Sequence, residues 1–549
     1  MKGVHHTMVT MFGLLHFLFL SALPAIAGDA DLLISFKNSL ANPSLLSDWN
    51  HVKGVCDFRG VACKEGYVSS LTIRELPLGA DFSSVSAHIL SLPNLETLSL
   101  HSTNLTGSIS APAKCTVQLK KLDLSSNDLR GSVSDVASLA VSCPSVQSLN
   151  LSNNSIGQAF YRSYPFLPNL KMLDLSYNKI ATNKDLQWLF SKLGLLQHLD
   201  LSNNNIPGTM PHITNCTSLQ HLDLSTNQLS GHIPAGTFSN CFDLFYLNLS
   251  SNNLIGTVPS DIMACTSLIA LSLSNNNFSG KIPILPLLSM RRLELLDLAF
   301  NNFNGSLPKS ISKLTSLELL NLSANKLSGH IPHSLCTHGV SSLKWLYLQD
   351  NFLTGYIPNS LSNCTNLVSL DLSLNLLSGS IPGSLGSLSN LKYLMMWQNN
   401  LNGEIPGKLS SLRSLRNLVL DYNNLTGTIP NGLVNCRSLN WISLASNQLT
   451  GSIPIWIGLS LSVIDLSNNR LSGPIPEWGS LPTFPEYVFD NNSGLCGLPL
   501  PPCNGGSPSK EDVHQQPSTN HESSQGWWIT LGLLFSFFLI IGFVIGLLI

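Results

Sequence analysis

Leucines recur along most of the chain at a fixed spacing, together with the polar residues between them. Residues 219–234 read LQHLDLSTNQLSGHIP, and the pattern LxxLxLxxNxLxGxIP returns about every 24 residues. The last two leucines of LxxLxL are two positions apart, so in a strand they point to the same side. The residues beside them then face solvent. The pattern predicts one short strand per repeat, with the leucines of stacked repeats forming a continuous core.

One asparagine holds the same place in every full copy of the pattern. Thr103 takes this place in a preceding copy, and residues 68–73 are a candidate for a degenerate first one. Because buried amides must be hydrogen-bonded, we expect these asparagines to bond backbone groups of the adjacent turn. The GxIP element is expected to turn the chain onto the convex side. The repeated asparagines are Asn127, Asn154, Asn178, Asn204, Asn227, Asn252, Asn276, Asn301, Asn325, Asn351, Asn375, Asn399, Asn423, Asn447 and Asn469.

This period and consensus are those of leucine-rich repeats, and LxGxIP resembles the plant-specific form found in receptor kinases and receptor-like proteins. The resemblance implies an α/β fold: a plant-type leucine-rich-repeat solenoid, a right-handed superhelix with a parallel concave sheet, disulfide caps and one C-terminal transmembrane helix. The expected parts are a signal peptide (1–27), an N-terminal cap (28–66), about 16–17 repeats (67–482), a C-terminal cap (483–504), a stalk (505–526) and a transmembrane segment (527–549).

The two ends of the chain place it outside the cell. Lys2, an apolar run at 11–23 and the small residues at 25–27 are typical of a secretory signal peptide, and the run is too short for a comfortable membrane anchor. Residues 527–549 contain no charge and are long enough to span a bilayer. A lipid-anchor signal ends in the same way and stays an alternative. We expect a single-pass type I protein of the plasma membrane with an extracellular ectodomain.

Composition and motifs exclude several functions. Only 11% of the residues are charged and the net charge is −2, which argues against nucleic-acid binding by phosphate neutralisation. The signatures G-x-S-x-G, H-E-x-x-H and those of kinases are missing. The 15 histidines show no spacing typical of metal ligands, and His101, His198 and His221 are expected on the solvated face. We therefore expect no enzyme activity, no cofactor and no metal site.

The cysteines fall into two groups. Two pairs lie just outside the repeats, and the family resemblance implies capping disulfides Cys56–Cys63 and Cys496–Cys503. Seven others stand one to a repeat, at nearly the same distance before the repeated asparagine, where we expect buried small side chains rather than zinc ligands. These are Cys115, Cys143, Cys216, Cys241, Cys265, Cys364 and Cys436.

Asn-x-Ser/Thr sequons are frequent and are glycosylation acceptors in a secreted chain, although some arise by accident in such a repeat. They are Asn104, Asn150, Asn153, Asn215, Asn248, Asn277, Asn304, Asn321, Asn363, Asn424 and Asn491.

The outward positions of the concave sheet change character late in the chain. Up to residue 322 they are mostly small or polar, and then aromatic residues gather on neighbouring strands. Because interfaces favour Tyr, Trp and Met, this region is a candidate ligand-binding surface. The alternative is that long side chains merely cover the sheet. The candidates are Trp345, Tyr347, Tyr393, Met395, Trp397, Tyr422 and Trp441.

Several stretches resemble the ectodomains of the plant brassinosteroid receptor kinase family, namely CDFRGVAC at 56–63, LNWISL at 439–444, IPIWIG at 453–458 and NNSGLCG at 491–497. The resemblance implies that Ile442, Ile455 and Trp456 match apolar positions of the hormone site. The chain departs from the family in lacking both the inserted island that completes the pocket and the kinase. The link at 458–461 is two residues short, as if repeats and island had been lost there. Losing half the burial of a steroid of roughly 400 Å2 would forfeit about 5 kcal/mol.

These observations favour a kinase-less receptor-like protein that binds a protein, peptide or hormone ligand and acts through or against a partner receptor kinase. The resemblance implies co-receptor kinases of the somatic-embryogenesis type, or a full-length receptor, as partners. One alternative is an extracellular inhibitor, similar to the leucine-rich-repeat proteins that block pathogen polygalacturonases. Another is a truncated receptor kinase product without independent function.

Overall fold

The computed structural model describes residues 28–110, 115–158, 169–192, 194–213, 215–336, 342–459 and 461–503. The chain divides into two compact units, 1–502 and 503–549, and the fold described here is that of the first. The expected signal peptide, stalk and transmembrane segment lie outside the described residues and stay predictions. Among the helices that the structure describes, none combines the length and the apolar character needed to cross a bilayer.

A long sheet runs through the described repeats, one strand per repeat. Its first two strands, β1 (Val61–Lys64) and β2 (Tyr67–Arg74), pair antiparallel, and every later strand pairs parallel and in register with its neighbour. Leu370, for example, pairs with Leu346 and Leu394 of the adjoining repeats. The later strands are β3 (Thr97–His101), β4 (Lys121–Asp123), β6 (Ser148–Asn150), β8 (Met172–Asp174), β9 (His198–Asp200), β11 (His221–Asp223), β13 (Tyr246–Asn248), β15 (Ala270–Ser272), β17 (Leu295–Asp297), β19 (Leu319–Asn321), β21 (Trp345–Tyr347), β23 (Ser369–Asp371), β25 (Tyr393–Met395), β27 (Asn417–Val419), β29 (Trp441–Ser443) and β31 (Val463–Asp465).

The segments that follow most ladder asparagines form further strands, where the sequence predicted only a turn. The glycine of the GxIP element still lets the chain turn there. Gly379, for example, has a φ of +77°, in the left-handed region that glycine adopts freely. Ten of these strands form a second parallel sheet in the described repeats. They are β10 (Pro207–Thr209), β12 (Gln228–His232), β14 (Asn253–Gly256), β16 (Asn277–Gly280), β18 (Asn302–Ser306), β20 (Lys326–His330), β22 (Phe352–Tyr356), β24 (Leu376–Ser380), β26 (Asn400–Glu404) and β28 (Asn424–Thr426). Smaller sheets join β5 (Arg130–Ser132) to β7 (Ser155–Gln158), and β30 (Thr450–Gly451) to β32 (Arg470–Pro474) and β33 (Gly494–Cys496).

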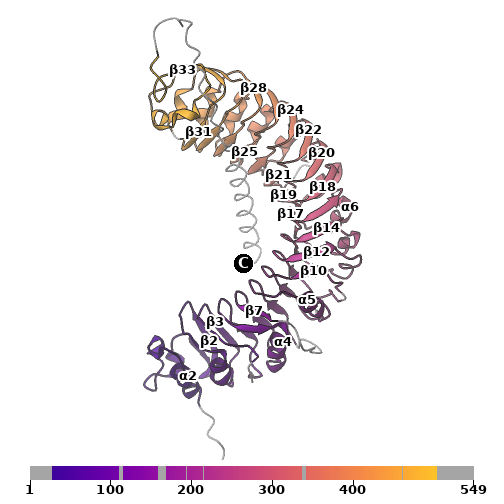
Figure 1. Ribbon diagram of the computed structural model, residues 1–549, viewed down its shortest axis with the longest axis vertical. Helices are drawn as coiled ribbons and strands as arrows, with labels where there is room; N and C mark the ends of the chain where they lie inside the picture. The colour runs from indigo at the N-terminus through magenta and orange to yellow at the C-terminus, as the bar shows by residue number, and fades with distance from the viewer. Residues whose placement is uncertain are drawn as a thin grey trace, which may run out of the picture. The chain divides into compact units, whose positions relative to one another are not determined.

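Short helices lie in many of the described repeats, on the side away from the long sheet, as Figure 1 shows for α6 (Ile284–Leu287) relative to β17. The longer ones are α4 (Val133–Ser142) and α5 (Asn183–Phe190); later repeats use 3-10 helices such as η6 (Asn359–Asn363), η7 (Gly383–Ser387), η8 (Gly407–Ser411) and η10 (Ile455–Gly458). Between strand and helix lies one continuous leucine core. Leu361, Leu367, Leu370 and Leu372 of a single repeat are all fully buried.

The ladder asparagines bond as predicted. The amide of Asn375 donates to the carbonyls of Leu348 (2.9 Å), Leu372 (3.2 Å) and Ser373 (2.9 Å), and its Oδ1 accepts from the backbone N–H of Leu353 (3.0 Å). Each asparagine thereby joins its own repeat to the preceding one. Asn492, which the sequence analysis placed in the C-terminal cap, makes the same set of bonds and is a further ladder position.

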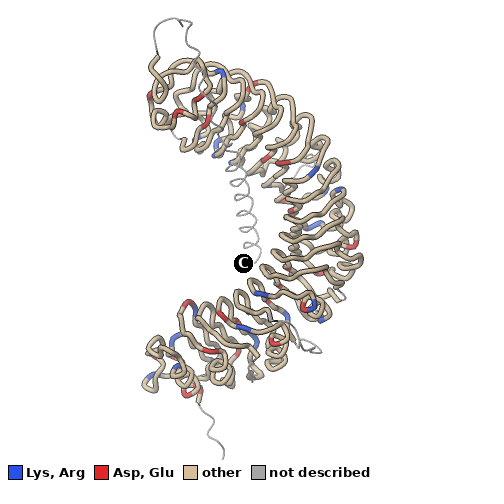
Figure 2. Tube along the Cα trace, in the orientation of Figure 1, with Lys and Arg blue, Asp and Glu red and all other residues tan. Residues whose placement is uncertain are grey.

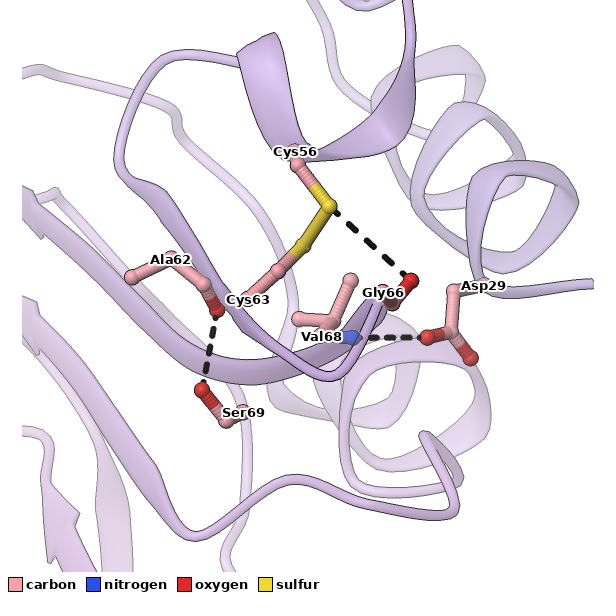
Figure 3. Close-up of a disulfide and its surroundings, with 7 residues drawn as sticks. All are labelled: Asp29, Cys56, Ala62, Cys63, Gly66, Val68 and Ser69. Carbon is pink, nitrogen blue, oxygen red and sulfur yellow. Dashed lines mark hydrogen bonds between the residues drawn. A yellow bond between two sulfur atoms is a disulfide. The ribbon is translucent and has the colours of Figure 1, made fainter.

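The N-terminal end of the core is closed by a small cap. Figure 3 shows the Cys56–Cys63 disulfide, which links η2 (Val55–Asp57) to β1, as the family resemblance implied. Nearby, the carboxylate of Asp29 accepts a hydrogen bond of 2.9 Å from the backbone N–H of Val68. This bond ties the start of α2 (Asp29–Asn38) to β2 and covers the first repeat.

Three further disulfides correct the expectation that the repeat cysteines are merely buried. Cys216 and Cys241 stand in the same register of neighbouring repeats, so stacking brings their Cα atoms to 4.7 Å, within disulfide range. Cys115–Cys143 and Cys336–Cys364 also join neighbouring repeats, with Cα atoms 4.8 and 5.3 Å apart, although their members differ in register; the sequence analysis did not consider Cys336. Cys265 and Cys436 are buried free thiols, as expected. Cys496 and Cys503 are disulfide-bonded, and their mutual pairing stays a prediction.

Candidate ligand-binding face

Of the five neighbouring strands β21, β23, β25, β27 and β29, the alternate strands β21, β25 and β29 carry large aromatic side chains on the solvent side of the long sheet. Their first residues pair in register in the order Trp345, Ser369, Tyr393, Asn417 and Trp441. Two positions later in each strand stand Tyr347, Asp371, Met395, Val419 and Ser443. We define the aromatic face as Trp345, Tyr347, Tyr393, Met395, Trp397 and Trp441.

The side chains of the aromatic face are partly exposed to solvent and partly packed against the sheet. Trp345, Tyr393, Met395, Trp397 and Trp441 are all half-buried. Neighbouring strands lie about 4.8 Å apart, so the five strands from β21 to β29 extend about 19 Å across the sheet. Half-buried aromatic side chains on rigid strands offer contact area at little cost in conformational entropy.

Tyr347 and Tyr422, also predicted to face a ligand, differ from each other. Tyr347 is only 4% exposed, because its neighbours on β19 and β23 cover it, and burial raises the pKa of its hydroxyl. It therefore supports the face rather than offering a contact. Tyr422 is 49% exposed and stands just beyond β27 with a φ of +51°.

Charged residues are thinly spread along the repeats, as Figure 2 shows, yet a pair adjoins the aromatic face. Lys344 Nζ lies 2.8 Å from the carboxylate of Glu318 and 5.8 Å from the centre of the Trp345 ring. Lys392 and Arg416 hold the same repeat position as Lys344 in the repeats of β25 and β27. The sequence analysis missed this pair, because Lys344 and Glu318 are 26 residues apart and only the repeat period brings them together.

A buried carboxylate lies beside the face. Asp421 is 8% exposed and accepts hydrogen bonds from the Ser443 hydroxyl and the backbone N–H of Ala445 (3.0 Å). Burial raises the pKa of Asp421 to about 7, and the carboxylate of Asp465 on β31 adds to the rise. Burial raises the pKa of Asp371, on β23, to about 6. The acidic groups behind the aromatic side chains therefore change charge near neutral pH.

The three hormone-site positions carried over from the family resemblance do not lie on this face. Ile442 is fully buried, since it holds the second leucine position of LxxLxL and points into the core. Ile455 and Trp456 lie in η10, which follows β30 of a different sheet; Ile455 is 62% exposed and Trp456 is 9% exposed. The structure therefore separates these residues from the aromatic face instead of joining them to it.

Eight of the eleven predicted glycosylation acceptors are exposed in the structure, two are half-buried and one is buried. Asn321 is 2% exposed, and its Oδ1 accepts from the backbone N–H and the hydroxyl of Ser323. A glycan does not fit there, because the third position of β19 is covered by the adjacent strands. Asn150 and Asn248 hold the equivalent strand position and are half-buried.

The stacked strands, the asparagine ladder and the capped first repeat define a leucine-rich-repeat solenoid protein. The Leucine rich repeat N-terminal domain family matches residues 26–64. Leucine rich repeat families match residues 195–216, 217–278, 292–314, 316–338, 341–401, 414–436 and 460–481. The chain belongs to the leucine-rich-repeat family.

Its relatives include plant hormone receptors. It is 48% identical over 222 residues to the Brassinosteroid LRR receptor kinase BRI1 of Oryza sativa subsp. japonica, covering 39% of this chain and 20% of that protein. It is 41% identical over 189 residues to the Protein BRASSINOSTEROID INSENSITIVE 1 of Arabidopsis thaliana, covering 34% and 16%. The chain thus spans about a fifth or less of the length of these relatives.

Solved structures show the same fold. The plant peptide hormone receptor RGFR1, in complex with RGF2, has a TM-score of 0.51 and 24% identity, covering 80% of this chain and 99% of that one. A leucine-rich-repeat protein of Leptospira interrogans also has a TM-score of 0.51, with 28% identity, covering 66% of this chain and 87% of that one.

Proposed function

We propose that this chain is the extracellular recognition part of a plant cell-surface receptor-like protein. It binds a peptide or protein ligand on the aromatic face and acts through, or against, a partner receptor kinase. The observation that carries the proposal is the set of half-buried aromatic side chains on the alternate strands β21, β25 and β29, with Trp397 just after β25. Such residues dominate protein interfaces.

The shape of the face favours an extended ligand over a compact steroid. About 19 Å of sheet matches the length of roughly six extended residues, whereas a steroid needs a pocket closed on several sides. The positions carried over for a hormone are divided between the core and η10. Lys392 and Arg416 next to Tyr393 would suit a ligand with an acidic group.

The relatives support the partner side of the proposal. The brassinosteroid receptor kinases related to this chain are receptors by name, and one fold neighbour was solved with a peptide bound. An ectodomain of this kind would act with a receptor kinase as its partner, such as a co-receptor of the somatic-embryogenesis type. Signal peptide, membrane anchoring and glycosylation are part of the same proposal.

The test is a binding screen on the full chain displayed at the surface of plant cells. The probes are a panel of secreted plant peptides, the ectodomains of receptor kinases, and a labelled brassinosteroid. We expect a peptide or an ectodomain to bind, and the variant Tyr393→Ala with Trp441→Ala to weaken that binding about 30-fold or more, as hot-spot residues do.

The matched control is Tyr356→Ala, which removes a 73% exposed aromatic side chain from β22 in the second sheet. It should bind as the unmodified chain does. Equal loss in both variants would contradict the aromatic face as the binding site. Saturable binding of the steroid alone would replace the peptide proposal with a hormone function.

A further inference from the structure

A cluster of two histidines and an aspartate lies on the long sheet, well before the aromatic face. His198 on β9 and His221 on β11 pair in register, and Asp200 follows His198 by two positions on the same side of the sheet. One ligand atom from each of the three side chains lies within 4.8 Å of the other two. Among the described residues, no other group of three such side chains comes together in this way.

The second imidazole of this cluster is buried with an unsatisfied nitrogen. His221 is 3% exposed, and its Nδ1 has no hydrogen-bond partner. The ring is held on both sides: it stacks on His198 with centroids 4.0 Å apart, and on Tyr246 with centroids 4.2 Å apart. A buried polar atom without a partner is costly, so a fixed ring with a bare nitrogen points to a missing ligand.

Like charges are crowded around the cluster. The carboxylates of Asp174, Asp200 and Asp223 stand in register on the adjacent strands β8, β9 and β11. The carboxylate of Asp223 accepts hydrogen bonds from the Tyr246 hydroxyl (3.2 Å) and the Asn248 amide (3.0 Å). Asp200 accepts one from the backbone N–H of Ser202 (2.8 Å). A cation beside Asp200 would offset the repulsion between neighbouring carboxylates on paired strands.

We propose that this chain binds one divalent transition-metal ion, such as Zn2+, through His198, His221 and Asp200. Two imidazoles and a carboxylate are a donor set that suits Zn2+, and three protein ligands leave a fourth position for water or another group. Bonds of about 2.0–2.1 Å in a tetrahedral shell require ligand atoms about 3.4 Å apart, so the side chains must close by an ångström or so. Because an imidazole nitrogen binds a metal in the plane of its ring, His198 must also turn out of its stack on His221. His198 and Asp200 are half-buried, which leaves a path for the ion.

The site is separate from the aromatic face, and its test does not depend on any ligand of that face.

The experiment uses the full chain, purified without a histidine tag, stripped with a chelator and titrated calorimetrically with Zn2+ and with Co2+. We expect one equivalent of either ion to bind, and a Co2+ absorption spectrum of low coordination number without a thiolate charge-transfer band. His221→Phe, which keeps a stacked ring, should weaken binding at least 10-fold. His101→Gln should leave it unchanged, since His101 on β3 bonds Ser125 and lies outside the cluster.

Asp200→Asn provides a second test that does not depend on the fit of a phenyl ring. It keeps both imidazoles and removes one of the crowded charges, so the melting temperature without metal should not fall. Added Zn2+ should raise the melting temperature of the unmodified chain by several degrees and leave that of Asp200→Asn unchanged. The proposal is overturned if Zn2+ and Co2+ fail to saturate a single site, or if Asp200→Asn folds and binds as tightly as the unmodified chain.

Discussion

Replacing one ladder asparagine should have a cost that can be counted from the structure. In Asn375→Ala the backbone N–H of Leu353 loses its acceptor, which costs about 1–3 kcal/mol for a buried donor. Three carbonyls each lose one donor but keep another: Leu348 retains Asn351, Leu372 retains Asn399, and Ser373 retains the N–H of Asp350. At roughly 0.5–1 kcal/mol for each lost bond, the total is about 4 kcal/mol.

The assay is denaturant unfolding of the full chain, combined with hydrogen exchange of peptides that contain Leu353. Exchange at the Leu353 amide should accelerate much more than at Leu401, which bonds Asn423 two repeats away. The control Asn400→Ala removes an exposed amide from β26 and should change the free energy of unfolding by under about 0.5 kcal/mol. A loss below about 1 kcal/mol in Asn375→Ala, with normal exchange at Leu353, would refute this account of the ladder.

Two further substitutions test other features of the repeats. Burial raises the pKa of Asp421 to about 7, so the folded chain binds more protons than the unfolded chain between about pH 4 and 7. The free energy of unfolding therefore falls as the pH rises through that window. Asp421→Asn should therefore be more stable than the unmodified chain by at most about 4 kcal/mol at pH 8, with the difference shrinking toward pH 4 in urea titrations; a difference independent of pH would exclude this titration. Gly386→Ala should destabilise by about 2 kcal/mol, because a Cβ there would lie 2.2 Å from the Lys408 carbonyl oxygen, whereas Gly407→Ala meets no atom within 4 Å and should melt normally. Equal melting temperatures for the two alanine variants would contradict the packing of η7 against η8.

The repeat period made most of the fold predictable. It placed the leucines inside and predicted that Asn375 and its equivalents bond backbone groups of the adjacent turn. It also placed Trp345, Tyr393 and Trp441 on the solvent side of the sheet. These follow from local spacing, because each repeat copies the geometry of the previous one.

What the sequence did not predict depends on contacts between repeats. Cys216 and Cys241, like His198 and His221, are about one period apart, and stacking turns that distance into direct contact. A search for cysteines or histidines separated by one period would have found both pairs. Ile442 was predicted to contact a ligand because it matches a hormone-site position of the related family. The LxxLxL register already assigned this residue to the core, where the structure has it.

The shared carbonyls of the ladder have a consequence for how such a gene can change. Every repeat carries a donor for the repeat before it and an acceptor for the repeat after it. If one whole repeat is removed, the two repeats that become neighbours therefore still carry matching donors and acceptors. The short link at 458–461 illustrates this: Asn469 still donates to Leu444 (2.9 Å) and accepts from Leu449 (3.0 Å) across it. Recombination can thus shorten or lengthen the protein in steps of one repeat, because the same hydrogen bonds form again between the repeats that become neighbours.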